Sequence, residues 1–537
     1  MSKKETKQTF LGGAAVLAAA VIVVKLIGAV YKIPLGNIIG AQGKTYFDGA
    51  YRIYNVLLTI STAGFPLAIS KLTSEAHALG RENEKHKLFR TSIWLFFAMG
   101  AVGSLLMFFG ARELAAFVNI PKAYWPIKAL SPAVFCVCLL ACMRGYTQGQ
   151  GNMKPTAVSQ VLEALCKLFI GLTLAYYLYR VLGKGREFGA AGAILGVTSG
   201  TLLSMLFLMF YLMRHRDRER ALDEAESSGA LIKKVLAIGI PITLSNSVMS
   251  IITLVDMKII IGRLETIPSL AKMADTLYGR YSFGMDLINL PASFVYPVTM
   301  SLIPFAAAAL ARHDNKEAAR TVNSAFRLIA ILAFPCGVGL SVLSTPIMLT
   351  LYPSQRSDAL AAGSLMRILG LACIVICVVL LSNAILQTYG HVYIPVCTMV
   401  VGGAVKVTSN YFLVGSPSIN IHGAPYSTLC CYSAIAILNL FFVWKYSPEK
   451  PNYLKIFLKP AIAAAAMGGA VWAAHGFFAR LLAGHSAYMA TAASTFCGIL
   501  VGVVVYAVLV IALGVLRAED VKNMKKGEKL IRILHLK

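Results

Sequence analysis

Long runs of apolar residues alternate with short polar stretches along almost the whole chain, from residue 10 to residue 516. Most runs reach about 20 residues, the length that a helix needs to cross the hydrocarbon layer of a bilayer. The pattern predicts an all-α polytopic membrane protein with about fourteen transmembrane helices and no sizeable soluble domain. The predicted spans are 10–32, 48–70, 91–110, 127–147, 155–179, 188–213, 233–262, 276–310, 322–344, 364–387, 391–413, 422–444, 456–479 and 487–516.

The composition supports this interpretation and excludes several classes of protein. Hydrophobic residues make up 57% of the 537 residues and charged residues only 14%, whereas a soluble domain has about 45–50% apolar and about 25% charged residues. An ordinary soluble enzyme and a disordered protein are therefore excluded. The net charge of +26 would suggest nucleic acid as the partner of a soluble chain. In a membrane protein it reflects Lys and Arg in cytoplasmic loops, so we expect no nucleic acid.

The basic residues also predict the orientation of the chain in the cell membrane. They gather in alternate loops, above all in 71–90, in 214–234 and in the tail from Arg517. Because Lys and Arg favour the cytoplasmic side, both termini are expected in the cytoplasm. The tail 517–537 mixes Lys with Leu and Ile at helical spacing. This spacing favours either a basic amphipathic helix on the inner leaflet or a solvated tail.

An internal repeat predicts two related halves, as in many transporters. A shift of 231 residues places PLAIS (66–70) on PVTMS (297–301), and a shift of 239 places Gly151 on Gly390. Six spans separate equivalent positions, so the halves are expected to share one orientation. A pseudo-two-fold axis near the membrane normal, with the substrate path between the halves, is the arrangement that this repeat favours.

The repeat divides the chain into five expected parts. The two lobes would hold six spans each, and the last two spans have no counterpart in the repeat. The parts are an N-terminal lobe 1–213, a cytoplasmic inter-lobe loop 214–232, a C-terminal lobe 233–444, two extra helices in 456–516 and the basic tail 517–537.

Charged side chains inside the predicted spans are candidates for a substrate site, because an ionisable group in hydrocarbon usually faces a cavity or a partner. Lys25 and Lys32 lie seven residues apart in the first span. This separation is close to two helical turns, so both project from one face. The shift of 231 carries Lys25 onto Asp256 and Lys32 onto Arg263. Equivalent positions in both halves are therefore expected to line a cavity.

A second group lies in the second and eighth spans. The same shift carries Asn55 onto Asp286. Arg52 is three residues from Asn55 and lies on the same helix face. Arg280 lies near the start of the eighth span. The alternative is that the basic residues near the outer ends extend to the lipid headgroups. This alternative applies to Lys32, Arg52, Arg263 and Arg280.

A deeper pair of lysines lies near the predicted middle of the bilayer. Lys167 is twelve residues into the fifth span, and the shift of 239 carries it onto Lys406. Both are candidates for substrate binding. For Lys167 a local ion pair with Glu163, four residues earlier, is an equally good explanation.

The sequence contains no motif that indicates catalysis, a cofactor or a bound metal. HExxH, GxSxG and P-loop motifs are missing, and no carboxylates cluster. The eleven Cys residues lie inside apolar runs, which is typical of packing residues. We therefore expect a transporter and no enzyme.

Three segments carry a family resemblance. YRIYNVLLTISTAGFPLAISKLTSE (51–75) is similar to the second span of the stage V sporulation protein B group. RGYTQGQGNMKPTAVSQVLEALCKL (144–168) and SPSINIHGAPYSTLCCY (416–432) resemble its other hallmark segments. The group lies in the polysaccharide-transporter branch of the MOP exporter superfamily, beside MurJ lipid II flippases and MATE exporters. The resemblance covers nearly the whole chain.

The resemblance implies a fourteen-helix, two-lobed flippase that moves an undecaprenyl-pyrophosphate-linked saccharide, such as lipid II, to the outer leaflet by alternating access. Its processes would be polysaccharide or peptidoglycan biosynthesis, or sporulation. MurJ proteins have a cationic cavity with Arg residues in spans one, two and eight. This chain departs from that pattern, with Lys25 and Lys32 in span one and Asp286 where a cavity Arg would align, while Arg52 takes one of the roles.

An alternative function is a MATE-like multidrug antiporter coupled to Na⁺ or H⁺. Asp256 and Asp286 would then form the cation site and the lysines would be peripheral. A membrane glycosyltransferase is a third class, which the short outer loops and the missing catalytic cluster disfavour.

Overall fold

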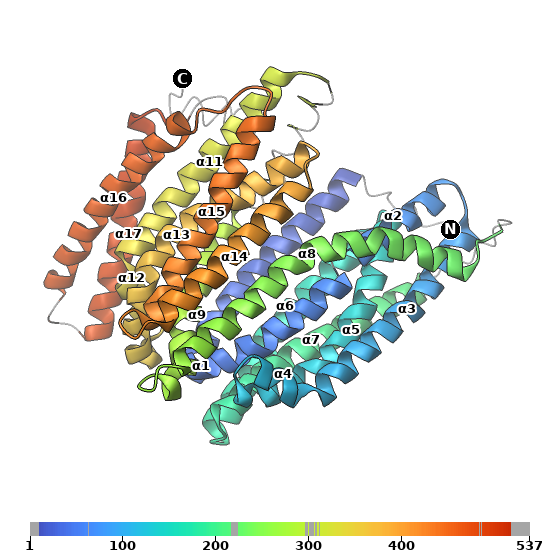
Figure 1. Ribbon diagram of the computed structural model, residues 1–537, viewed down its shortest axis with the longest axis horizontal. Coiled ribbons are helices and arrows are strands. Elements are labelled where there is room, and N and C mark those ends of the chain that lie inside the picture. The colour runs from blue at the N-terminus through green and yellow to red at the C-terminus, as the bar shows by residue number, and fades with distance from the viewer. Residues whose placement is uncertain are drawn as a thin grey trace, which may run out of the picture. The chain divides into compact units, whose positions relative to one another are not determined.

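The computed structural model describes residues 10–62, 64–215, 224–295, 312–482 and 486–516, together with residues 299, 306, 309, 310 and 484 (Figure 1). Every regular element in these ranges is a helix. Eleven of the helical segments described are long and apolar enough to cross a membrane, or twelve if the bent pair Ser228–Leu244 and Ser247–Glu265 is one span. The all-helical, multi-pass architecture is confirmed. The number fourteen stays a prediction, because the expected span 276–310 is described only in part.

The chain forms two compact units, the first ending at Gly262 and the second beginning at Arg263. The first contains α1 (Phe10–Thr62), α2 (Phe65–Ala78), α3 (Glu82–Phe109), α4 (Ala111–Phe117), η1 (Pro121–Ala123), α5 (Tyr124–Gly149), α6 (Lys154–Tyr176), η2 (Tyr177–Val181), α7 (Arg186–Arg214) and nearly all of α8 (Ser228–Glu265). The second contains η3 (Ala271–Met273), α9 (Ala274–Ser293), α11 (Asn315–Val342), α12 (Ser344–Leu351), η4 (Pro353–Gln355), α13 (Arg356–Thr388), α14 (Tyr393–Gly415), η5 (Asn420–His422), α15 (Gly423–Tyr446), α16 (Tyr453–Leu481) and α17 (Ala487–Ala512). The division of the sequence into lobes stays a prediction, and the tail 517–537 lies outside the described residues.

A sharp break at Gly40 divides α1 into two arms. Gly40 has φ 71° and ψ 180°, a backbone conformation that is essentially restricted to glycine. Tyr31 and Phe47 would lie about 24 Å apart along a straight helix, yet their ring centroids are 6.1 Å apart. The chain therefore reverses direction near Gly40, and the arms correspond to the first two predicted spans.

Helices α6 and α7 pack closely through a row of glycines one turn apart on α7. A Cβ atom at Gly192 would lie 2.8 Å from the Leu174 carbonyl carbon, and one at Gly200 would lie 2.8 Å from the Glu163 carbonyl oxygen. A Cβ at Gly196 would overlap the backbone of Gly171. Small residues at such spacing let membrane helices approach backbone to backbone. This contact fixes the position of α6, which carries Glu163 and Lys167.

Helix α8 is tied to the second arm of α1 and to the start of α2. The Arg52 guanidinium donates to the Thr253 carbonyl oxygen at 2.7 Å. The hydroxyls of Thr59 and Ser250 are 2.9 Å apart, and the Gly64 backbone amide donates to Thr243 Oγ1 at 3.2 Å. These contacts explain why α8 belongs to the first compact unit.

The two units repeat one order of elements. The series α3, α4, η1, α5, α6, α7 corresponds to α11, α12, η4, α13, α14, α15. The 3₁₀ turns η1 and η4 both begin with a proline, at Pro121 and Pro353. Within each unit the packing also corresponds: α3 contacts α5 and α5 contacts α7, just as α11 contacts α13 and α13 contacts α15.

The correspondence extends to single residues. Gly151 has φ 77° and Gly390 has φ 84°, and each lies in the turn before the next helix. Helices α6 and α14 each have 23 residues. Lys167 and Lys406 occupy the same place in them, since 167 − 154 = 13 and 406 − 393 = 13. The shift of 239 residues therefore joins positions of like conformation.

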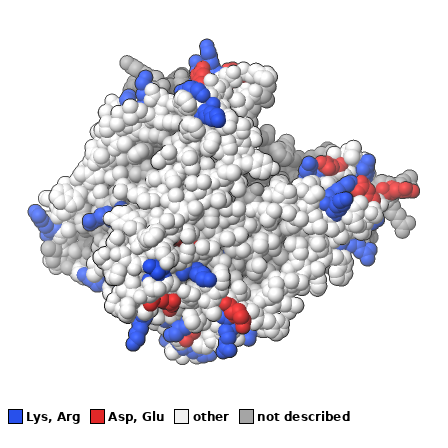
Figure 2. Space-filling view, viewed as in Figure 1, with Lys and Arg blue, Asp and Glu red and all other residues white. Residues whose placement is uncertain are grey.

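Helices α16 and α17 form a core of their own with α11 and α12. Met467 and Val471 from α16 pack with Tyr506 and Val510 from α17 and with Leu343. On the face seen in Figure 2, broad uncharged areas cover the middle of the helices and most charged side chains gather near helix ends. This distribution suits segments that cross an apolar layer.

Candidate functional site

Lys167 is held between aromatic rings inside the first unit. Its Nζ lies 5.0 Å from the centroid of the Tyr31 ring and 4.6 Å from that of Tyr51. The same atom is 3.4 Å from the Tyr51 hydroxyl. Phe47 stacks on Tyr51 at 5.5 Å between centroids. A cation over ring faces is attracted by the ring quadrupole, so the two tyrosine rings are favourable partners for the Lys167 ammonium group.

Glu163 is paired with a residue from another helix and not with Lys167. The Arg144 guanidinium on α5 contacts Glu163 Oε2 at 3.1 Å and donates to Ser159 Oγ at 2.9 Å. Ser159, Glu163 and Lys167 follow one another at four-residue intervals along one face of α6. The local ion pair considered for Lys167 is therefore replaced by an inter-helical pair with Arg144.

The remaining candidates of the first unit lie on α1 and α8. Lys25 and Lys32 are half-buried on the first arm of α1, and Asn55 is half-buried on the second. Arg52 is half-buried, and its guanidinium donates a hydrogen bond to the Thr253 carbonyl oxygen. Asp256 is one turn beyond Thr253 and is only 1% exposed.

The candidates of the second unit are engaged by protein groups or buried. Arg263 Nε donates to the Tyr411 carbonyl oxygen at 3.1 Å, and its guanidinium lies 4.2 Å from the centroid of that tyrosine ring. Arg280 forms an ion pair with Asp358, with Nε 2.9 Å from Oδ1. Asp286 is half-buried on α9, and Lys406 is 6% exposed on α14.

Sequence reasoning missed the partners that give Lys167 and Glu163 their surroundings. Arg144 lies only three residues from the predicted inner end of the fourth span, where a basic residue is ordinary. Tyr31 and Tyr51 resemble the aromatic residues found near membrane interfaces. Their contacts with Lys167 require the reversal at Gly40 and the packing of α1 on α6. The spacing of residues within a single helix therefore predicts neither the pairing of Glu163 with Arg144 nor the contacts of Lys167 with the tyrosines.

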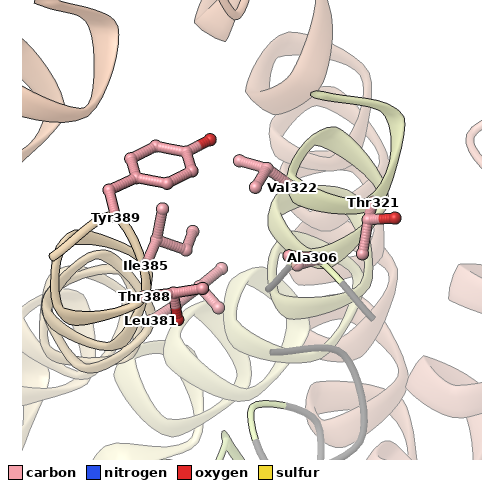
Figure 3. A pocket seen from close by; sticks show the side chains of 8 residues that line it. Ala306, Thr321, Val322, Leu381, Ile385, Thr388 and Tyr389 are labelled. Carbon is pink, nitrogen blue, oxygen red and sulfur yellow. The ribbon is translucent and has the colours of Figure 1, made fainter. Parts of the chain in front are cut away.

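One small cavity lies in the second unit between α11 and α13, next to the turn after α13 (Figure 3). Figure 3 shows Ile385 and Leu381 of α13 opposite Val322 of α11, with the Tyr389 ring above them. The free volume is about 10 Å³, which is room for about one water molecule. Burial raises the pKa of the Tyr389 phenol, and its contact with the Ser447 hydroxyl opposes that rise. The cavity is too small for a transported substrate.

Within the described ranges, no group of three or more His, Cys, Asp or Glu side chains is placed to hold a metal ion. The basic side chains of the candidate set, such as Lys25, Lys32 and Lys167, are of the kind that binds an anion.

The family description "Polysaccharide biosynthesis protein" matches residues 10–310, which is more than half of the chain. Three proteins of Bacillus subtilis (strain 168) are similar in sequence. The uncharacterized membrane protein YabM is 26% identical over 97% of this chain and 96% of its own length. Stage V sporulation protein B is 24% identical over 98% and 99%. Lipid II flippase MurJ is 22% identical over 77% and 78%.

Solved structures share the fold at low sequence identity. The inward closed conformation of lipid II flippase MurJ aligns with a TM-score of 0.69 at 14% identity, covering 93% of this chain and 99% of the other. The inward-facing conformation of a multidrug resistance MATE family transporter of the MOP superfamily aligns with a TM-score of 0.61 at 14% identity, covering 84% and 98%. Both units of this chain therefore contain residues that align with the solved structures.

Proposed function

Because this chain belongs to the polysaccharide biosynthesis protein family of MOP transporters, which are not enzymes, we propose that it is a lipid-linked saccharide flippase. The cargo is an undecaprenyl-pyrophosphate-linked saccharide, such as lipid II or a related cell-wall or polysaccharide precursor. The protein moves it from the inner to the outer leaflet of the cell membrane by alternating access. Both termini lie in the cytoplasm.

The observation that carries the proposal is the set of basic side chains held at membrane depth in the first unit. Lys167 is half-buried between two tyrosine rings, and Lys25 and Lys32 are half-buried on α1. A pyrophosphate must lose water to cross the membrane, and an uncompensated charge in an apolar medium is very costly. Lysine side chains offer the compensating charge as compact cations.

The proposed site has different roles for different residues. Lys25, Lys32 and Lys167 bind the pyrophosphate, and Lys406 is the counterpart of Lys167 in the second unit. Arg52 in the first unit, and Arg263 and Arg280 in the second, contact Thr253, Tyr411 and Asp358, so we assign each of them a positioning role within its own unit. Asn55 and Asp256 are the further polar candidates of the first unit, and Asp286 is that of the second.

A cation-coupled multidrug antiporter is the second candidate function. The fold similarity to a MATE family transporter and the deep burial of Asp256 support it. In that function Asp256 and Asp286 bind Na⁺ or H⁺, and transport of cationic dyes into vesicles depends on a Na⁺ or H⁺ gradient.

Complementation of a strain depleted of its lipid II flippase tests the proposal. The wild-type chain should restore growth. Lys25→Ala should lose complementation while its amount in the membrane stays near that of the wild type. Lys25→Arg should retain most of the activity, because it keeps the charge. Lys122→Ala removes an exposed lysine of η1 and serves as the matched control, which should grow like the wild type.

Full growth with Lys25→Ala would refute the role of Lys25 in headgroup binding. If the wild-type chain itself fails to complement yet drives gradient-dependent dye uptake, the antiporter is the correct function. Should Lys25→Ala and Lys25→Arg both be missing from the membrane, Lys167→Ala and Lys167→Arg provide the same comparison at an independent lysine.

A further inference from the structure

A large pocket lies at one end of the first unit, between the beginnings of α3 and α8 and the ends of α5 and α7. In Figure 1 the first residues of α8 are drawn at the right-hand side, close to α3. The volume of the pocket is about 1050 Å³. The segment 71–90, which contains the start of α3, is rich in Lys and Arg, so this end is the one predicted to face the cytoplasm.

One part of the pocket wall is basic. Lys87 and Arg90 come from the first turns of α3, together with His86, and His215 comes from the end of α7. Lys87 Nζ is 3.4 Å from the Ala225 carbonyl oxygen, and Arg90 is exposed. The described residues of the lining include no Asp or Glu. This part of the wall therefore favours an anion.

The other part of the wall is apolar and includes side chains of α3 and α7. Phe89 packs against Tyr146 with ring centroids 4.3 Å apart. Trp94 and Met213 also line the pocket, and they are 64% and 70% exposed. Both lie on helices long and apolar enough to span a membrane. Their exposed surfaces therefore face the region where acyl chains would lie.

The arrangement points to one class of ligand, a membrane lipid with an anionic phosphate headgroup. We propose that this pocket binds a resident anionic phospholipid of the inner leaflet, with the phosphate near Lys87 and Arg90 and an acyl chain along Phe89, Trp94 and Met213. Basic pockets between spans on the cytoplasmic side are suited to such headgroups. A soluble anion would leave the apolar wall unused, and a zwitterionic lipid would gain little from the two cations.

The proposed lipid site is independent of the flippase proposal. It uses none of the lysines assigned to cargo binding, and it lies at a helix end where Lys25 and Lys167 do not line the wall. A failure of either proposal leaves the other standing.

Lipid binding to the full-length protein, purified in detergent and depleted of lipid, tests the site. The probes are phosphatidylglycerol and phosphatidylcholine with identical acyl chains, and native mass spectrometry gives their affinities. Phosphatidylglycerol should bind on the order of 10-fold more tightly. Lys87→Gln/Arg90→Gln should remove that preference, and Trp94→Gln should weaken both lipids.

The matched control is Arg112→Gln/Lys122→Gln, which removes two exposed positive charges beyond the opposite end of α3. It should keep the preference for phosphatidylglycerol. An equal loss of preference in the control, or an unchanged preference in Lys87→Gln/Arg90→Gln, would overturn the proposal. Displacement of bound phosphatidylglycerol by an equimolar amount of undecaprenyl pyrophosphate would also overturn it, because the pocket would then be a cargo entrance. If Lys87→Gln/Arg90→Gln does not fold, Lys87→Arg/Arg90→Lys should retain the preference and Lys87→Gln alone should reduce it.

Discussion

Arg280 shows how a basic residue inside a span can be neutralised by its own protein. Its guanidinium contacts the Asp358 carboxylate at 2.9 Å, and the two side chains are 17% and 10% exposed. A buried ion pair contributes little net stability compared with an apolar pair, but the loss of one partner leaves a buried charge uncompensated. Arg280 is therefore expected to matter first for the stability of the second unit.

We predict that Asp358→Asn lowers the free energy of unfolding by about 3 kcal/mol, toward the lower end for buried pairs because Arg280 keeps some exposure. Arg280→Met should destabilise to a similar extent, whereas Arg280→Met/Asp358→Leu should recover much of the loss. Thermal unfolding midpoints of the purified proteins measure these changes. A normal midpoint for Asp358→Asn combined with lost transport would instead assign the Arg280 charge to the cargo.

The surroundings of single residues were the least predictable part of the protein. Glu163 and Lys167 are four residues apart on one helix, and helical spacing alone favours an ion pair between them. The structure pairs Glu163 with Arg144, nineteen residues away in sequence, and places Lys167 over Tyr31 and Tyr51. Such choices depend on how helices pack, and the sequence pattern of one helix does not contain that information.

Helices as units were much more predictable, although their limits were not. The expected span 155–179 corresponds closely to α6, Lys154–Tyr176. The expected span 91–110 begins nine residues later than α3, Glu82–Phe109. The polar first turns of α3 continue the helix beyond its apolar part. Apolar character marks the depth of the membrane, whereas the helix ends where its backbone hydrogen bonds end.

The reversal within α1 depends on Gly40. A residue with a Cβ atom at φ 71° and ψ 180° is strained by about 1–3 kcal/mol. Gly40→Ala should therefore lower the thermal midpoint and the amount of protein in the membrane. The matched change is Gly28→Ala in the same helix, where an added Cβ meets no atom within 4 Å. It should be neutral or stabilise by up to about 1 kcal/mol. Equal behaviour of the two variants would contradict the assigned role of Gly40.

The whole molecule combines a repeat visible in sequence with an orientation that the basic loops predict. The expected orientation places the turn before α15 outside the cell and the segment after α15 inside. An epitope inserted between Pro417 and Ser418 should bind an antibody on intact cells. An epitope between Glu449 and Lys450 should bind only after permeabilisation. Flow cytometry measures both, and the reverse pattern would invert the predicted topology.

The all-helical, multi-pass fold of the described residues could be predicted from the sequence, because long apolar runs identify helices that can cross a membrane. The shift of 239 residues, found from a few matching letters, joins Gly151 and Gly390, which share a positive φ. It also joins two helices of 23 residues with a lysine at the same place. The extent of the first compact unit, which ends at Gly262 within α8, has no such signature.

The membership of α8 in the first unit has a consequence for biosynthesis. Arg52, Thr59 and Gly64 find their hydrogen-bond partners on α8, and about 50 residues separate the end of α7 from Gly262. Since a ribosome adds about 5–20 residues each second, this delay is roughly 2–10 s. During that interval the nascent chain exposes an unfinished surface beside the insertion machinery. A chaperone that shields the second arm of α1 would act in this window, before the second half of the protein has been translated.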